Sequence, residues 1–141
     1  MKITVKRIET AEEMQAAHQI RKDVFVEEQG VSLREEIDKF EDESIHILAS
    51  IKGNPVGTAR WRTTEKGLKL ERFAVIKKYR TTGIGKTLLE FCLEENAHIS
   101  HIYLNAQLTV IGFYQKYGFI EVGEEFSEAG IMHRQMEYFG L

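Results

Sequence analysis

The sequence predicts a mixed α/β fold in which one sheet of about seven strands is flanked by about four helices. Three observations favour this class. Short segments of alternating apolar residues occur in both halves of the chain, and segments with helical periodicity lie between them. In the middle, a strand runs through a short glycine-containing loop into a helix. The predicted order is strand, two helices, three strands, helix, strand, helix, two strands.

Length and composition limit the possible classes of protein. With 141 residues, 43% of them hydrophobic and 29% charged, residues 1–141 are expected to form a single globular domain. No apolar run is long enough to span a bilayer and the start has no signal-peptide pattern, so we expect a cytoplasmic protein. The net charge of -3 argues against a nucleic-acid partner. One cysteine, Cys92, leaves no disulfide and no cysteine cluster for a metal, and we expect no nucleophilic role for it.

The amino-terminal half contains the first helices and the longest strands. Thr10 is expected to start a helix, with Glu13 completing a capping box, and the helix should run to about Glu28. A short second helix is expected at Ile37–Glu41. The strands expected here are Ile3–Val5 with Ile8, Ile45–Ile51, Val56–Thr64 and Leu68–Val75.

The carboxy-terminal half is also predicted to contain both helices and strands, and most of them are shorter. Helical periodicity covers Gly83–Asn96, with its apolar residues on one face. The remaining elements expected are a strand at Ile102–Leu104, a helix at Val110–Tyr117, and strands near Ile120–Val122 and Ile131–Tyr138.

The loop before the Gly83 helix carries the strongest chemical signal. A Walker phosphate loop would need glycine at position 80, which is Arg80, and a dinucleotide fingerprint would need glycine at Leu88, so both motifs fail. The free N–H groups and positive dipole of a helix start still suit a pyrophosphate, and Gly83 and Gly85 allow close backbone approach. Glycine-rich loops also occur without ligands. Positively charged side chains near this loop are Lys77, Lys78, Arg80 and Lys86.

Two spaced motifs resemble those of the GNAT acetyltransferases. Arg80-Thr81-Thr82-Gly83-Ile84-Gly85 is similar to the family's Arg/Gln-x-x-Gly-x-Gly/Ala signature, and it directly follows the strand that ends at Val75. Phe113–Phe119, with its tyrosine-glycine-phenylalanine ending, resembles the second motif. The resemblance covers nearly the whole chain. Finer features resemble the small bacterial ElaA-like branch: Val24–Gln29, Glu36–Asp38, Leu104–Gln107 and Ala129–His133.

The resemblance implies a fold and a co-substrate. Strands four and five of a mostly antiparallel sheet would be parallel and splayed, and the pantetheine arm of acetyl-CoA would lie between them. Backbone groups of Phe73 and Val75 would bind the pantetheine amides, and Asn105 would contact its side. The implied cofactor-binding residues are Phe73, Ala74, Val75, Arg80, Thr81, Thr82, Gly83, Ile84, Gly85, Lys86, Thr87 and Asn105, with no metal.

Three residues are candidates for the catalytic groups. By resemblance, Tyr114 would lie near the sulfur as general acid, and a phenol suits a thiolate leaving group; the alternative is a core aromatic. Glu71 is expected on the same side of its strand as Phe73 and Val75 and could act as general base, or it could be an ion-pair partner of an arginine, Arg60 or Arg62. His133, near the last hairpin, is a second candidate base or a structural histidine.

The function implied is N-acetyltransfer from acetyl-CoA directly to a primary amine. The acceptor stays open between a small amine, an amino sugar such as glucosamine 6-phosphate, and a peptide or lysine. The acidic stretch Glu27–Glu43 is either a solvated surface or a mouth that attracts a cationic acceptor. We expect the acceptor site between Gln29–Asp38, Glu71 and the His133 hairpin. The alternatives are a non-catalytic acyl-CoA-binding or sensing module and, for Gly85-Lys86-Thr87, ATP hydrolysis; a homodimer is compatible with the family.

Overall fold

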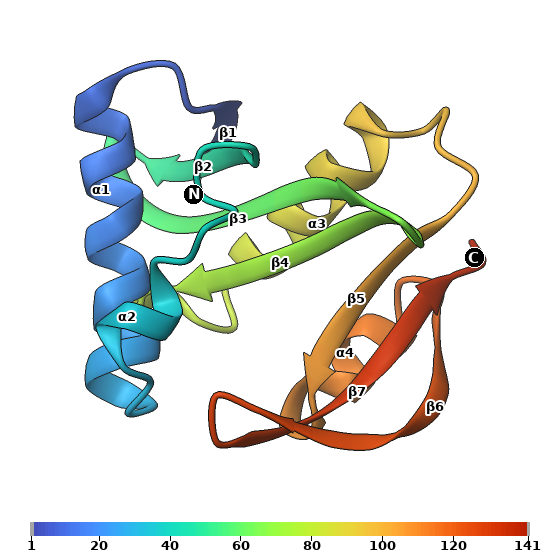
Figure 1. Cartoon of the computed structure of the whole chain (residues 1–141). Helices are drawn as coiled ribbons and strands as arrows, with labels where there is room; N and C mark the ends of the chain where they lie inside the picture. The colour runs from blue at the N-terminus through green and yellow to red at the C-terminus, as the bar shows by residue number, and fades with distance from the viewer. Residues whose placement is uncertain (1, 141) are drawn as a thin grey trace.

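A computed structural model describes residues 2–140 and shows a single sheet with helices on both faces (Figure 1). The sheet has seven strands in the order β1-β2-β3-β4-β5-β7-β6. Every neighbouring pair is antiparallel except β4 and β5, which are parallel. The strands are β1 (Ile3–Arg7), β2 (Ile45–Ile51), β3 (Asn54–Thr64), β4 (Gly67–Val75), β5 (Ile102–Gln107), β6 (Phe119–Glu128) and β7 (Ile131–Tyr138). The predicted mixed α/β class is confirmed, and so is the predicted succession of helices and strands along the chain.

The helices follow the predicted order with one error of position. The first helical segment consists of α1 (Ala11–Arg21) and a π-helical continuation, η1 (Lys22–Glu28). The expected capping box is present, because the Thr10 hydroxyl accepts from the backbone N–H of Glu13, and the Glu13 carboxylate accepts from that of Thr10. The other helices are α2 (Leu33–Glu36), α3 (Ile84–Glu95) and α4 (Ile111–Gln115), with short 3-10 turns at Lys77–Tyr79 and Leu108–Val110.

The prediction of a helix at Ile37–Glu41 was wrong. The helix lies one turn earlier because the Ser32 side chain caps it, accepting from the backbone N–H of Glu35 at 3.1 Å. It ends at Ile37, whose backbone is extended. The following residues turn back toward the sheet, where Asp38 and Glu41 pair with Arg60.

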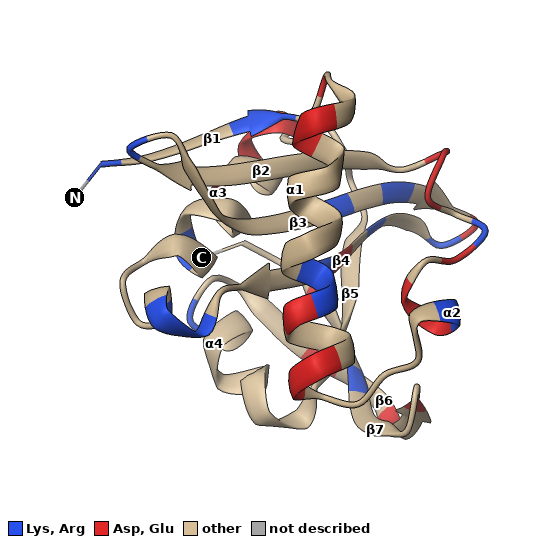
Figure 2. Ribbon diagram, turned by 90° about the vertical axis from the view of Figure 1, so that its left-hand side faces the viewer, with Lys and Arg blue, Asp and Glu red and all other residues tan. Residues whose placement is uncertain are grey.

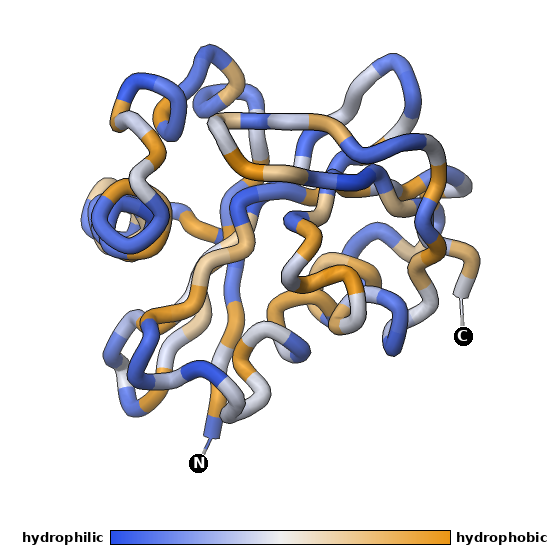
Figure 3. The backbone as a smooth tube through the Cα atoms, turned by 90° about the horizontal axis from the view of Figure 1, so that it is seen from below, coloured by the Kyte–Doolittle hydropathy of each residue, from blue (hydrophilic) through white to orange (hydrophobic). Residues whose placement is uncertain are grey.

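Two apolar clusters pack on opposite faces of the sheet. The larger contains α3 and α4 residues such as Leu88 and Tyr114, and the smaller joins α1 and η1 to Leu48 and Ala74. Figure 3 shows α1 end-on at one side of the sheet. Gly57 permits the close approach of α3, because a Cβ there would lie 2.8 Å from Ile84 Cγ2. The core therefore fixes the start of α3 against the sheet.

Candidate active site

The parallel strands β4 and β5 separate along their length. Only three residue pairs join them, and the last is Leu70 with Leu104. Strand β4 nevertheless continues to Val75 and β5 to Gln107. In Figure 1 the two strands start together and diverge toward their carboxyl ends. The divergence leaves a gap in the sheet beside the last residues of both strands, as the predicted splay requires.

A β-bulge at Arg72 and Phe73 sets which side chains of β4 face this gap. Both residues stand opposite Ala59, since Thr58 pairs with Ala74 and Arg60 with Glu71. Arg72 has φ of 60°, which is unusual for a non-glycine residue and typical of a strained functional segment. The extra residue reverses the alternation of side chains along the strand.

The bulge overturns the expected placement of Glu71. Phe73 and Val75 pack against the cluster that contains Tyr114, whereas Glu71 lies on the opposite face with Arg60 and Arg62. Simple alternation along a strand placed all three on one side, and the inserted residue makes that wrong. The expected ion-pair alternative for Glu71 is present with both arginines.

The loop between β4 and α3 contains two residues with a left-handed backbone and leads into an uncapped helix start. Thr81 and Gly83 have positive φ values of 68° and 93°, and Gly83 precedes α3 without any side-chain cap. The helix start therefore presents free N–H groups to solvent. The exposed residues here are Thr81, Thr82, Gly83 and Lys86, with Gly85 and Thr87 half-buried; Ile84 is buried in the core and anchors the loop.

The Arg80 side chain is committed to contacts within the protein. Its Nε donates to the Val75 carbonyl oxygen at 3.0 Å, and Nη1 and Nη2 donate to the Glu28 carboxylate at 2.9 and 2.8 Å. The Arg80 hydrogen bonds hold the pKa of Glu28 below its usual range. Arg80 thus ties the end of β4 to the end of η1.

Tyr114 on α4 is buried beside the gap. Its ring meets Phe73 edge to face with centroids 6.0 Å apart, and it also contacts Phe113 and Phe119. Its hydroxyl makes no hydrogen bond to another residue between 2 and 140. Burial raises the pKa of Tyr114, so the phenol stays protonated at neutral pH. A neutral phenol in this position can donate a proton.

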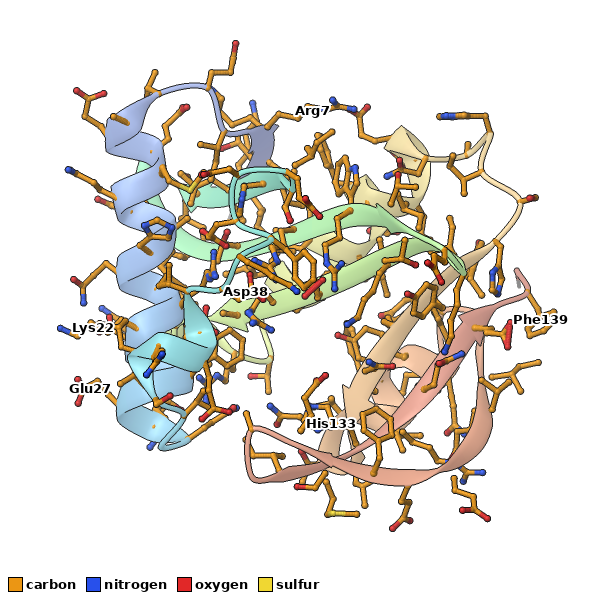
Figure 4. All side chains as sticks on the ribbon, viewed as in Figure 1. Arg7, Lys22, Glu27, Asp38, His133 and Phe139 are labelled. Atoms are coloured by element: carbon orange, nitrogen blue, oxygen red, sulfur yellow. The ribbon has the colours of Figure 1, made fainter. Side chains whose placement is uncertain are left out.

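The opposite face of the gap carries polar side chains from β5, β7 and η1. Gln107, the last residue of β5, pairs with His133 on β7, so both side chains lie on one face. Gln107 Nε2 donates to Gln29 Oε1 at 2.9 Å. Asn105 pairs with Gln135 one step along the same face. Figure 4 labels His133 on the β6–β7 hairpin and Asp38 near α2, on either side of the opening.

His133 is oriented by the backbone. Its Nδ1 lies 2.7 Å from the Ile131 carbonyl oxygen, which can only accept, so Nδ1 carries the proton. In the neutral imidazole Nε2 is then free to accept a proton, and it lies 3.6 Å from a Glu128 carboxylate oxygen. The ring stacks on Phe126 with centroids 5.9 Å apart.

Half of the carboxylates in the acidic stretch Glu27–Glu43 pair with arginines. Glu36 pairs with Arg21 and Arg72, and Asp38 with Arg60 and Arg72. Figure 2 shows acidic segments at α2 and the loop after it beside basic stretches of β3 and β4. These ion pairs hold the acidic segment against the sheet. Half of its carboxylates are therefore not free to attract a cationic acceptor.

Other candidate groups have structural surroundings. Cys92 is fully buried, and burial raises the pKa of its thiol, which disfavours the thiolate. His46 is buried against the Glu41 carbonyl oxygen. Within residues 2–140 no three His, Cys, Asp or Glu side chains are arranged to hold a metal ion, and the helices in that range are all too short or too polar to cross a membrane.

Solved structures share this architecture. Escherichia coli ElaA superimposes with a TM-score of 0.85 and 28% identity, covering 97% of this chain and 99% of that one. An acyl-CoA N-acyltransferase from Pseudomonas aeruginosa gives a TM-score of 0.83 and 27% identity over 97% and 98% of the two chains. Fold and splayed strands thus define an N-acyltransferase class.

Sequence comparison places the chain within that class. Residues 8–139 match the family model for the acetyltransferase (GNAT) domain. The chain is 42% identical to the uncharacterized N-acetyltransferase YjcF of Bacillus subtilis, over 89% of this chain and 91% of the relative. It is 31% identical to Escherichia coli protein ElaA over 86% and 84% of the two chains. The chain belongs to the GNAT acetyltransferase family and is an acyltransferase.

Proposed function

We propose that this protein transfers the acetyl group of acetyl-CoA directly to a primary amine. The observation that carries the proposal is the gap between β4 and β5, which has a buried neutral phenol on one side and an uncapped helix start at its end. The family supplies the co-substrate class, because its fold uses acetyl-CoA.

The co-substrate would occupy the gap and the loop. Backbone groups of Phe73, Ala74 and Val75 would bind the pantetheine arm, since β4 has no neighbour on the β5 side beyond Leu70. The pyrophosphate would bind backbone N–H groups between Thr81 and Lys86, with Lys86 adding charge. The N–H and hydroxyl of Thr87 already donate to the Gly83 carbonyl oxygen, so Thr87 would contribute by fixing the helix start. Arg80 would contribute by holding the loop, because its guanidinium is already occupied. Asn105 would contact the arm from β5.

The transfer would proceed in one chemical sequence. The amine nitrogen attacks the acetyl carbon, a backbone N–H near Val75 stabilises the oxyanion, and the C–S bond then breaks. Coenzyme A leaves as the thiol after taking the proton of Tyr114, and the proton that the acylated nitrogen loses as the amide forms restores the phenol. A relay through Cys92 is disfavoured by its full burial.

The proton of the attacking ammonium needs an acceptor, and His133 is the better placed of the two candidates. Its Nε2 is the unprotonated nitrogen of the neutral ring, and it lies on the face opposite Tyr114. Burial tends to raise the pKa of Glu71, but attraction from Lys69 and ion pairs with Arg60 and Arg62 outweigh it and keep the carboxylate ionised. We therefore assign Glu71 to the support of β4.

The acceptor would enter on the polar face, between the Gln29–Asp38 segment and the His133 hairpin. Pairing of half of the carboxylates in the acidic stretch with arginines weakens the argument for a cationic acceptor. Small amines, amino sugars including glucosamine 6-phosphate, and peptide amines therefore remain candidates.

The test combines binding with turnover. Acetyl-CoA at about a hundredfold excess over its Kd should raise the Tm by roughly 5–10 °C, while ATP should have little effect. Thiol release over a panel of amines would then identify the acceptor. A protein that shows no acetyl-CoA stabilisation and no thiol release with any amine would contradict the proposal.

A further inference from the structure

The gap between β4 and β5 is crossed by side-chain contacts on both faces. On the α3–α4 face, Phe73 of β4 meets Tyr114. On the other face, Gln29 at the end of η1 accepts a hydrogen bond from Gln107 at the end of β5, 78 residues away in sequence. A thioester held in the gap would lie between these two crossings.

Gln29 is held in place by the residue before it. The Glu28 carboxylate accepts two hydrogen bonds from Arg80, which also donates to the Val75 carbonyl oxygen. Glu28 is thus joined to the β4 side of the gap while Gln29 reaches the β5 side. The dipeptide Glu28–Gln29 therefore spans the open end of the gap and places the Gln29 amide next to Gln107.

We propose that Gln29 and Gln107 determine which nucleophiles reach the thioester, an inference that rests on the proposed acetyltransferase function. Their hydrogen bond closes the acceptor face beside His133, which is paired with Gln107 across the β5–β7 ladder. An acceptor enters by replacing this bond with hydrogen bonds of its own to the two carboxamides, which offer both donors and acceptors. Water and other small nucleophiles are kept away while the bond is intact.

The strength of the bond suits such a role. It joins an exposed neutral side chain, Gln29, to a half-buried one, Gln107, and such a bond changes an equilibrium by only about three- to tenfold. A specific acceptor can therefore displace it at little cost. Removing the bond should increase transfer of the acetyl group to water and other small nucleophiles, here called leakage, by the same factor.

The experiment uses water and hydroxylamine as probes of access. Each nucleophile forms a bond to the acetyl carbon and loses a proton, the C–S bond breaks, and coenzyme A leaves as the thiol. Gln29→Ala and Gln107→Ala should each raise protein-dependent release of coenzyme A from acetyl-CoA by about three- to tenfold. The double variant should show no further increase, because either change breaks the same bond.

A second pair of substitutions separates the bond from general loosening. Gln29→Glu keeps the acceptor oxygen that faces Gln107 Nε2 and should leak like the wild type. Gln107→Leu removes both the donor and the acceptor at 107 at nearly constant volume, and it should leak like the alanine variants. Gln19→Ala is the matched control, since Gln19 donates to Asp23 on the exposed surface of α1 at 2.9 Å.

Calorimetry with coenzyme A distinguishes a failure of this inference from a failure of the proposed acetyltransferase function. The Kd of all variants should stay within about twofold of wild type, since a neutral hydrogen bond outside the cofactor contacts is removed. Three results would each overturn the inference while leaving the proposed function intact. They are normal binding with unchanged leakage, additive effects of the two alanine substitutions, and a Gln29→Glu variant that leaks as much as Gln107→Leu. Absence of coenzyme A binding in the wild type would overturn the proposed function and the inference together.

Discussion

The ring of Phe73 on β4 meets the ring of Tyr114 on α4 edge to face, at 6.0 Å and an interplanar angle of 70°. Phe73 reaches this face only because the bulge inserts Arg72 into the strand. The guanidinium of Arg72 in turn donates to Asp38 at 3.1 Å, in the loop after α2. The environment of the candidate acid thus depends on a backbone irregularity held from the other face of the sheet.

Tyr114→Phe should lower kcat by about 10²–10⁴-fold, because it removes the proposed proton donor and keeps the ring. The Kd for acetyl-CoA should hardly change, and the free energy of unfolding should stay within about 1 kcal/mol, because the hydroxyl has no hydrogen-bond partner among residues 2–140 to lose. The raised pKa keeps the phenol protonated, so the loss should be constant between pH 6 and about pH 9. Steady-state kinetics and calorimetry measure both quantities.

Tyr117→Phe is the matched control, since Tyr117 belongs to the same aromatic group through Phe113. Equal losses of affinity and turnover in Tyr114→Phe would identify Tyr114 as a packing residue instead.

Gly85→Val should abolish the thermal shift produced by acetyl-CoA while leaving the fold intact. A Cβ at Gly85 would lie 3.5 Å from the Phe113 ring, an ordinary contact, and valine is no worse than glycine in a helix. The branched side chain would instead occupy the approach of the pyrophosphate to the helix start. The same valine at exposed Glu90, in the middle of α3, is the control and should keep the full shift. If Gly85→Val keeps the thermal shift, the pyrophosphate does not bind at this loop.

Glu41→Gln should lower the free energy of unfolding at pH 7 by about 3 kcal/mol, as expected for breaking a buried ion pair. Glu41 pairs with Arg21 and Arg60, whose side chains are almost completely buried. Burial alone would raise its pKa, but hydrogen bonds from Arg21 and His18 lower it from 4.5 to about 2. The stability that Glu41 contributes is therefore complete above pH 4.5 and is lost as the pH falls toward 2.

Chemical denaturation at a series of pH values measures this contribution. The difference between wild type and Glu41→Gln should shrink over the interval from pH 4.5 to 2. A difference that persists unchanged at pH 2 would show that packing, and not the charge of Glu41, is responsible.

His133→Ala and Glu71→Gln should give different pH profiles once an acceptor is known. If His133 removes the proton, its alanine variant should lose most kcat/KM at low pH, where neutral amine is scarce. Glu71→Gln should scale kcat/KM down by one factor at every pH, because it weakens the support of β4 through Arg60 and Arg62. If instead Glu71→Gln loses most kcat/KM at low pH and His133→Ala is lowered equally at every pH, Glu71 is the base. If both variants are lowered equally at every pH, water accepts the proton.

Local patterns were enough to predict much of the fold. The capping box at Thr10 and Glu13, the strand Ile131–Tyr138, and the helix after Gly83 were all predicted close to their observed positions. Each depends on periodicity, capping or turn residues within a few positions, which a single sequence displays directly. The signature at Arg80–Gly85 and the second motif at Phe113–Phe119 also indicated the family that the comparisons identify.

Contacts between distant segments were decided only by the tertiary structure. The bulge that separates Glu71 from Phe73 arises from pairing with β3, and no residue type in β4 announces it. The Glu28–Arg80 pair and the Gln29–Gln107 bond join segments 52 and 78 residues apart. Whether a charge is free or already paired depends on such packing, because burial favours pairing of every carboxylate with an available arginine. Composition alone could not reveal that half of the carboxylates in the acidic stretch are paired with arginines.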